Sequence, residues 1–169
     1  RENLYPAVGK DMSNLMGRSL LATSYLRLSE VVPRNAYYYE TIKKLLFPIP
    51  AESQLTAEYL TALAEWYFFL QRFEQAEDLL DRFLKNNPNA EILYQRARIY
   101  AEKRDNDKAI ALLNRALSSS TKVNPRYATL YAELFERKNQ IDVALPPLKR
   151  VTQQNPEYAP AFILASRIR

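Results

Sequence analysis

The sequence contains no cysteine and no histidine. These absences exclude disulfide frameworks, thiol chemistry, Cys/His zinc sites and any catalytic arrangement that needs an imidazole. Glycine occurs only twice, at Gly9 and Gly17, so a glycine-rich loop that cradles phosphate cannot be assembled. Acid–base catalysis by carboxylates alone survives this elimination, but no pair of acidic residues stands out at a turn. We therefore predict a non-catalytic protein without a cofactor or a metal.

Long apolar segments are also missing. The most apolar stretches, such as WYFFL at 66–70, are far shorter than the roughly 20 residues that a membrane-spanning helix needs. No secretory signal pattern is present, and the chain begins with Arg1 rather than Met, which indicates a piece of a longer protein. We expect a soluble segment of the cytoplasm or the bacterial periplasm, since a lack of cysteine fits both compartments.

The net charge of +5 is distributed unevenly along the chain. Residues 51–88 contain seven acidic and three basic groups, a net charge of −4, whereas 1–50, 89–124 and 125–169 each have a net charge of +3. Proteins that bind nucleic acid usually gather their basic groups in one stripe or patch. The alternation of sign seen here disfavours nucleic acid as a partner.

An internal repeat is the strongest positive signal. Apolar residues recur at intervals of three and four, which predicts helices throughout. Three segments align, each with an alanine followed four residues later by a leucine: 72–88 with Ala76, 105–121 with Ala109 and 140–156 with Ala144. A second helical segment precedes each one, at 57–70, 90–103 and 125–138, with aligned alanines at 64, 97 and 132. Small residues let the helices of a pair approach closely, and such pairs must stack to bury their apolar faces.

In its period and its pattern of small and apolar residues, the chain resembles the tetratricopeptide repeat (TPR) family over about two thirds of its length. The resemblance implies an all-α fold, a right-handed superhelical array of antiparallel helix pairs. It places repeats at 57–88, 90–121 and 125–156, with the start of a further repeat or a capping helix at 158–169. Arg96 departs from the family, which usually has a large apolar residue at that position.

The first third of the chain, residues 1–50, matches the repeat less well. Helical patterns at 11–32 and 35–47 are separated by Pro33, which ends the first of them. We interpret this region as a helical hairpin or a degenerate repeat. As a hairpin it would form the first layer of the array, and its many tyrosines would line the junction with the first repeat.

In TPR arrays the first helix of each pair lines a concave groove that holds a peptide or a helix of a partner, and the resemblance implies the same here. Residues spaced by four share one helix face. The predicted partner-binding residues are Thr61, Glu65, Phe68, Phe69, Tyr94, Arg98, Glu102, Arg126, Thr129, Glu133 and Arg137.

Glu65, Arg98 and Glu133 have the same place in successive repeats, so stacking should bring them together. One interpretation is an internal ladder in which Arg98 is shared by two carboxylates, because charges held close together are normally paired. The other is a polar clamp in which Arg98 and Arg137 bind an acidic partner. The family's clamp for chaperone tails has Asn where Glu65 and Arg98 stand here, which disfavours that ligand.

The aromatic stretch EWYFFL at 65–70 also has two interpretations. Phe68 and Phe69 either pack as core against the hairpin of 11–47 or form an aromatic hot spot for a partner. The core interpretation is favoured, because large exposed apolar patches are uncommon.

Three functions follow from these features. The leading hypothesis is a protein–protein interaction scaffold that binds a peptide or helical segment within a larger assembly, such as bacterial envelope or export machinery. The second is an RNA-binding helical-pair repeat, which the acidic residues of the groove oppose by repelling phosphates. The third is a structural spacer or oligomerisation module.

Pro146 and Pro147 interrupt the second helix of the third repeat. A proline inside a helix removes a backbone donor and clashes with the carbonyl four residues earlier, at a cost of roughly 3 kcal/mol. We expect the regular helix to start late, around Leu145, or else to begin on time and bend.

Overall fold

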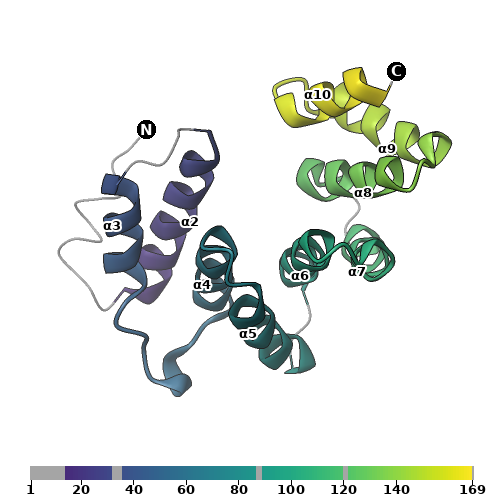
Figure 1. Ribbon diagram of the computed structural model, residues 1–169. Coiled ribbons are helices and arrows are strands. Elements are labelled where there is room, and N and C mark those ends of the chain that lie inside the picture. Colours follow the sequence, from purple (N-terminus) through teal and green to yellow (C-terminus); the bar gives the residue numbers. More distant parts are fainter. Residues whose placement is uncertain (1–13, 32–35, 87–88, 120–121, 169) are drawn as a thin grey trace. The chain divides into compact units, whose positions relative to one another are not determined.

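The computed structural model describes residues 14–31, 36–86, 89–119 and 122–168 (Figure 1). Within these ranges the secondary structure consists of α-helices and one short 3₁₀ helix, without a strand, so the prediction of an all-α fold is confirmed. The helices group into two compact units, residues 1–87 and residues 88–169. We describe each unit by itself.

The first unit contains a hairpin, a long connection and a helix pair. Its elements are α2 (Leu15–Val31), α3 (Ala36–Leu46), the 3₁₀ helix η1 (Glu52–Gln54), α4 (Ala57–Phe69) and α5 (Phe73–Asn86). The second unit contains two helix pairs and a further helix. Its elements are α6 (Ala90–Glu102), α7 (Asn106–Ser118), α8 (Pro125–Arg137), α9 (Ile141–Gln154) and α10 (Ala159–Ile168).

The first helix of each repeat begins at a side-chain cap. Thr56 accepts a hydrogen bond from the Tyr59 amide at 3.2 Å, and Asn89 accepts one from the Ile92 amide at 2.9 Å. Asn124 accepts one from the Arg126 amide at 3.0 Å, with Pro125 at the first helical position. Such caps satisfy amides that have no partner inside the helix, which explains why each helix starts at these residues.

The turns inside the three helix pairs have the same geometry. The residues Gln71, Arg104 and Asn139 have φ of 59°, 64° and 58°, the left-handed region. In each turn the following amide reaches back to a carbonyl five residues earlier, as from Arg72 to Tyr67 at 2.8 Å. This is the Schellman arrangement that closes a helix. Its recurrence at the repeat spacing shows that the sequence repeat is also a repeat of backbone conformation.

The aligned small residues of the repeat are buried. All six alanines have at most 2% of their surface exposed, and the aligned leucines have at most 1%: Ala64, Ala76, Ala97, Ala109, Ala132 and Ala144, with Leu80, Leu113 and Leu148. In the second unit one core cluster joins α8, α9 and α10 through Ala132, Leu148 and Leu164. The burial follows from the close approach that alanine permits between paired helices.

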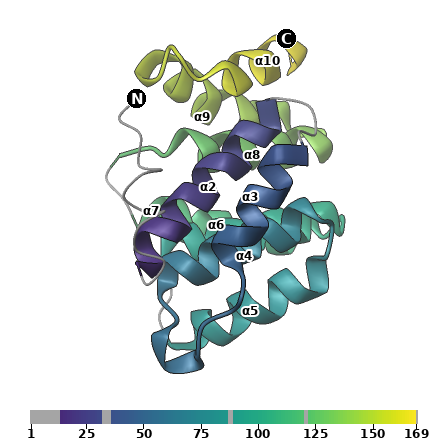
Figure 2. The same ribbon diagram turned by 90° about the vertical axis from the view of Figure 1, so that its left-hand side faces the viewer.

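The α2–α3 hairpin packs on α4 in an unusual way (Figure 2). Helix α4 packs closely on α2 and only slightly on α3, whereas in the second unit α8 packs more closely on α7 than on α6. Two hydrogen bonds hold the end of α3: Arg18 donates to the Leu45 carbonyl at 2.8 Å, and Tyr59 donates to the Leu46 carbonyl at 2.6 Å. The connection from 47 to 56 is long enough to let α4 bypass α3.

Several tyrosines of the hairpin are packed within the first unit. Tyr25 and Tyr38 lie at the edge of a core that includes Ile42 and Leu63, and their ring centroids are 5.4 Å apart. Tyr39 packs on Trp66 of α4 with ring centroids 4.9 Å apart. Pro33 and residues 11–13 of the predicted N-terminal helix lie outside the described residues.

Helix α9 begins at Ile141, so the predicted late start around Leu145 was wrong. The Ala144 amide already donates to the Gln140 carbonyl at 3.2 Å. The two prolines remove only the bonds that would reach the carbonyls of Asp142 and Val143, both at exposed residues where water can replace the donor. Buried Ala144, Leu148 and Val151 anchor the helix instead. A bend at the prolines stays a prediction.

Candidate functional site

A cluster of aromatic and charged side chains joins the first helices of the two repeats in the second unit. The rings of Tyr94 on α6 and Tyr127 on α8 are stacked with centroids 4.6 Å apart. The Arg126 guanidinium lies 4.8 Å from the centroid of the Tyr94 ring, and that of Arg98 lies 5.8 Å from it. Arginine above an aromatic face is attracted by the electrons of the ring, so these contacts fix the orientation of both cations.

Glu91 is the anionic centre of this cluster. Its carboxylate accepts hydrogen bonds from Arg126 at 3.2 Å, from the Tyr127 phenol at 2.7 Å and from Gln95 at 3.0 Å. Burial, together with the bond to the Glu91 carboxylate, raises the pKa of Tyr127 well above its ordinary value. The phenol is therefore neutral at physiological pH and acts as a donor. Gln95 in turn accepts a hydrogen bond from Arg98 at 3.1 Å.

A second set of polar contacts lies toward the C-terminal ends of the same helices. Arg137 donates to the Ala101 carbonyl at 3.1 Å and pairs with Glu133 at 2.8 Å. The first bond ties α8 to the end of α6, where carbonyls have no partner within the helix. From α10, Arg167 pairs with Glu136 of α8 through two hydrogen bonds of 2.8 and 2.5 Å. We call the surface formed by Tyr94, Arg98, Arg126, Glu133 and Arg137 the α6–α8 face.

Two other predicted residues belong to helices α6 and α8. Thr129 is buried, and no described residue hydrogen-bonds its hydroxyl. Glu102 is exposed at the last residue of α6. The structure thus brings Tyr94, Arg98 and Arg126 directly together and places Glu133 and Arg137 in one ion pair.

The predicted ladder of Glu65, Arg98 and Glu133 spans both units. Glu65 is 5% exposed and belongs to the first unit, whereas Arg98 and Glu133 belong to the second. Glu133 forms its ion pair with Arg137, one turn along its own helix. The sharing of Arg98 between two carboxylates therefore stays a prediction.

The remaining predicted residues lie on α4. The Thr61 hydroxyl donates to the Ala57 carbonyl at 2.7 Å, within its own helix. The Phe69 ring is stacked on Trp66 with centroids 5.9 Å apart and packs against the core of the first unit, as the core interpretation requires. The Phe68 ring meets that of Phe73 edge to face at 5.4 Å, across the turn into α5.

Sequence reasoning missed Glu91, Gln95 and Tyr127. Glu91 lies three residues before Tyr94 and Gln95 three before Arg98, so both share a face with predicted residues. That spacing was a usable signal. Tyr127 follows Arg126 directly, and only the three-dimensional stacking on Tyr94 shows its part in the cluster.

The described residues lack two other kinds of functional feature. Across residues 14–31, 36–86, 89–119 and 122–168, the acidic side chains form no group of three that could hold a metal ion. In the same part of the chain, each helix is too short or too polar to cross a membrane.

Comparison with known proteins shows which proteins this chain is similar to. A family model described as tetratricopeptide repeat matches residues 61–124. Among curated proteins, the chain is 25% identical over 114 residues to the Drosophila melanogaster BBSome complex member BBS4 homolog. This alignment covers 67% of the chain but only 24% of that relative, so the chain spans about a quarter of its length.

Solved structures show the same fold. TTC0263, a thermophilic TPR protein of Thermus thermophilus, is 26% identical with a TM-score of 0.73, over 96% of this chain and 86% of that one. YrrB, a TPR protein with an unusual peptide-binding site, is 18% identical with a TM-score of 0.57, over 99% and 82%. MamA is 18% identical with a TM-score of 0.58, over 92% and 86%. The match at residues 61–124 and these solved structures support assignment to the tetratricopeptide repeat family, and the fold is a TPR-like α-solenoid.

Proposed function

We propose that the chain binds a peptide or a helical segment of a partner protein on the first-helix faces of its repeats, as a non-catalytic scaffold within a larger assembly. The TPR fold is a protein–protein interaction scaffold, and the α6–α8 face is the observation that carries the more specific proposal. There, contacts between α6 and α8 hold Tyr94, Tyr127 and Arg126, and a contact within α6 holds Arg98 against the Tyr94 ring.

The physical reason is the small entropic cost of binding on such a face. Ordering a long side chain at an interface costs about 0.5–1.5 kcal/mol. Arg126 is already held by the Glu91 carboxylate and the Tyr94 ring, and Arg137 by Glu133 and the Ala101 carbonyl. The side chains of Arg126 and Arg137 remain 20% and 26% exposed, so a ligand can reach them. Tyrosine and arginine are also the residue types that most often dominate binding energy.

The same contacts argue against RNA as the ligand. Arg126, Arg137 and Arg167 are each paired with a glutamate, at 91, 133 and 136. Lysines and arginines bind RNA by neutralising its phosphates, which releases the counterions condensed on the RNA. Carboxylates next to these cations repel the phosphates of the RNA. A protein ligand with mixed charge fits this face better.

The relatives support a role in an assembly. The Drosophila relative is named as a member of a complex, and YrrB is described as having a peptide-binding site. Both properties belong to those proteins, and we extend their general class to this chain as part of the proposal.

Selection of peptides from a displayed random library on the immobilised protein tests the proposal. Binding of the selected peptides is then measured by calorimetry for the wild type, for Arg98→Ala on the α6–α8 face, and for Arg150→Ala. Arg150 is exposed on α9 and serves as the matched control. We expect Arg98→Ala to weaken binding about tenfold and Arg150→Ala to leave it unchanged. Equal affinities in all three proteins would exclude the α6–α8 face as the binding site.

A further inference from the structure

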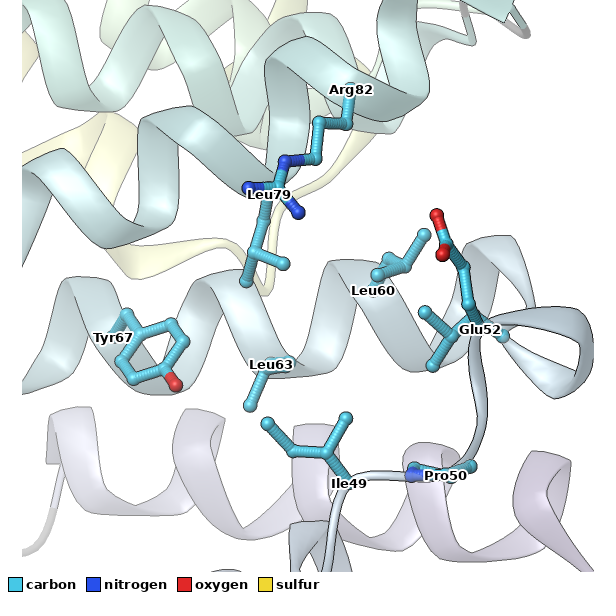
Figure 3. Close-up of a pocket in the computed structure, with 9 residues that line it drawn as sticks. Ile49, Pro50, Glu52, Leu60, Leu63, Tyr67, Leu79 and Arg82 are labelled. Carbon is cyan, nitrogen blue, oxygen red and sulfur yellow. The ribbon is translucent and has the colours of Figure 1, made fainter.

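A cavity of about 510 Å³ opens in the first unit (Figure 3). It lies between the connection that follows α3 and the pair of helices α4 and α5. Its lining is formed by Ile49, Pro50, Glu52, Leu55, Leu60, Leu63, Tyr67, Leu79 and Arg82. This volume lies within the range of roughly 300–1,000 Å³ typical of ligand sites.

Most of the residues that line the cavity are apolar. Leu60, Leu63 and Tyr67 follow helical spacing and point from α4, with Leu63 almost fully buried. Figure 3 shows Ile49 of the connection on one side and Leu79 of α5 on the other. Ile49 is 48% exposed, so a large aliphatic side chain stands at the opening and in contact with water. Covering it would bury apolar surface, which favours an apolar occupant.

The charges around the opening of the cavity are negative on balance. Glu52 lies at the end away from Tyr67, and Arg82 lies on the same side of the cavity as Leu79 (Figure 3). Arg82 is paired with Asp78 at 2.8 Å, which offsets its charge, whereas Glu52 is exposed. The whole segment 51–88 has a net charge of −4, and every other segment of the chain is positive. The surroundings of the cavity therefore attract cations more than anions.

We propose that this cavity is a second docking site, which receives a bulky apolar side chain from a basic peptide segment of a partner protein. The apolar lining accepts the side chain, and the acidic surroundings attract the lysines or arginines that flank it. Leu60, Leu63 and Tyr67 face a different direction from Thr61, Glu65 and Phe68, since one residue turns a helix by about 100°. A ligand here would therefore leave the predicted first-helix face open.

Three synthetic, fluorescein-labelled nonapeptides test the proposal. The first has a central Leu-Phe pair flanked by lysines. The second has glutamates in place of the lysines, and the third has serines in place of Leu-Phe. Binding is followed by fluorescence anisotropy and by the methyl NMR signals of Ile49, Leu63 and Leu79. We expect the first peptide to bind, to shift these methyl signals and to bind more weakly as salt is added, because salt screens the attraction. The other two peptides should bind at least about tenfold more weakly.

Matched variants locate the site. Ile49→Ser removes the exposed aliphatic side chain at the cavity. Ile163→Ser is its control, at an isoleucine that is 65% exposed on α10 in the other unit. Glu52→Gln removes the acid of the rim, and Glu157→Gln removes an exposed acid of the second unit, outside the acidic segment 51–88. We expect Ile49→Ser to weaken the first peptide about tenfold and Glu52→Gln to weaken it severalfold, while both controls bind like the wild type.

Other outcomes would overturn the proposal. Equal binding of the lysine and glutamate peptides would show that the charge of the partner is wrong. Binding of the serine peptide, or equal loss in Ile49→Ser and Ile163→Ser, would show that the cavity is not the site. Methyl shifts that appear when the protein is concentrated without peptide would assign the cavity to a second copy of the chain instead.

Discussion

At the scale of single residues, Tyr59 links burial to stability at alkaline pH. Its side chain is fully buried and donates to the Leu46 carbonyl at 2.6 Å, and burial raises its pKa to about 12. In the unfolded chain a tyrosine ionises near pH 10, about two pH units lower. The neutral phenol therefore contributes stability that is complete below about pH 10 and is lost as the pH rises toward 12. We expect the free energy of unfolding to fall over this interval.

The variant Tyr59→Phe tests this linkage by urea unfolding at several pH values between 9 and 12. Near neutral pH the variant should lose about 1 kcal/mol, because the Leu46 carbonyl loses its donor. Above pH 10 its stability should fall less steeply than that of the wild type, and the remaining slope is expected from Tyr127, whose pKa burial also raises. Tyr39→Phe on α3, at an exposed tyrosine, is the control. Parallel pH curves for Tyr59→Phe and the wild type would rule out the linkage.

Residue patterns predicted part of the α6–α8 face. Helical spacing placed Tyr94 with Arg98, and Glu133 with Arg137, because residues four apart on one helix meet whatever surrounds them. Contacts between helices are a different matter, since they depend on how far one helix is shifted along the other. Sequence reasoning therefore named Arg126 without its partner Glu91, which lies 35 residues away on α6.

At the scale of the elements, Pro146 destabilises helix α9, and a single substitution can remove this destabilisation. Pro146 occupies the sixth position of the helix, where an alanine amide would donate to the Asp142 carbonyl. Its side chain is exposed, so the substitution Pro146→Ala loses little packing. A proline inside a helix is about 3 kcal/mol less favourable than alanine, and alanine returns up to about 1 kcal/mol of freedom to the unfolded chain. We expect Pro146→Ala to stabilise the protein by about 2 kcal/mol, measured by urea unfolding.

Pro160→Ala provides the contrast for this measurement. Pro160 is the second residue of α10, and amides of the first turn have no partner inside a helix. It is exposed like Pro146, so the two substitutions differ mainly in helix position. Pro160→Ala should give no gain in stability. A similar gain at both sites would mean that the position inside α9 does not matter.

Helix boundaries were largely predictable, whereas helix packing in the first unit was not. The caps Thr56, Asn89 and Asn124 and the alanine-leucine spacing act locally, so the sequence contains them in full. The start of α9 was predicted too late, because the penalty of two prolines was weighed without the anchoring burial of Leu148. The packing of α4 on α2 depends on the path of residues 47–56, and no short-range pattern specifies that path.

At the scale of the whole molecule, the repeat architecture predicts that stability is local. In a solenoid each repeat contacts only its neighbours, so a group of stacked pairs can fold without the remainder. The second unit has its own core, with Ala132, Ala144 and Leu148 buried among α8, α9 and α10. We expect a fragment of residues 88–169 to be helical by circular dichroism and to unfold cooperatively in urea.

Truncation of a buried side chain in the second unit shows whether the fragment keeps the native core. Leu148→Ala removes a side chain that is 1% exposed, and such truncations cost about 2–5 kcal/mol. Leu145→Ala, three residues earlier in the same helix at a site 39% exposed, should change stability by less than about 1 kcal/mol. We expect the same two values in the fragment and in the full chain, because the described residues of this core cluster all lie within the second unit. A fragment without a cooperative transition, or a Leu148→Ala effect that appears only in the full chain, would show that the core of α6–α10 depends on the first unit.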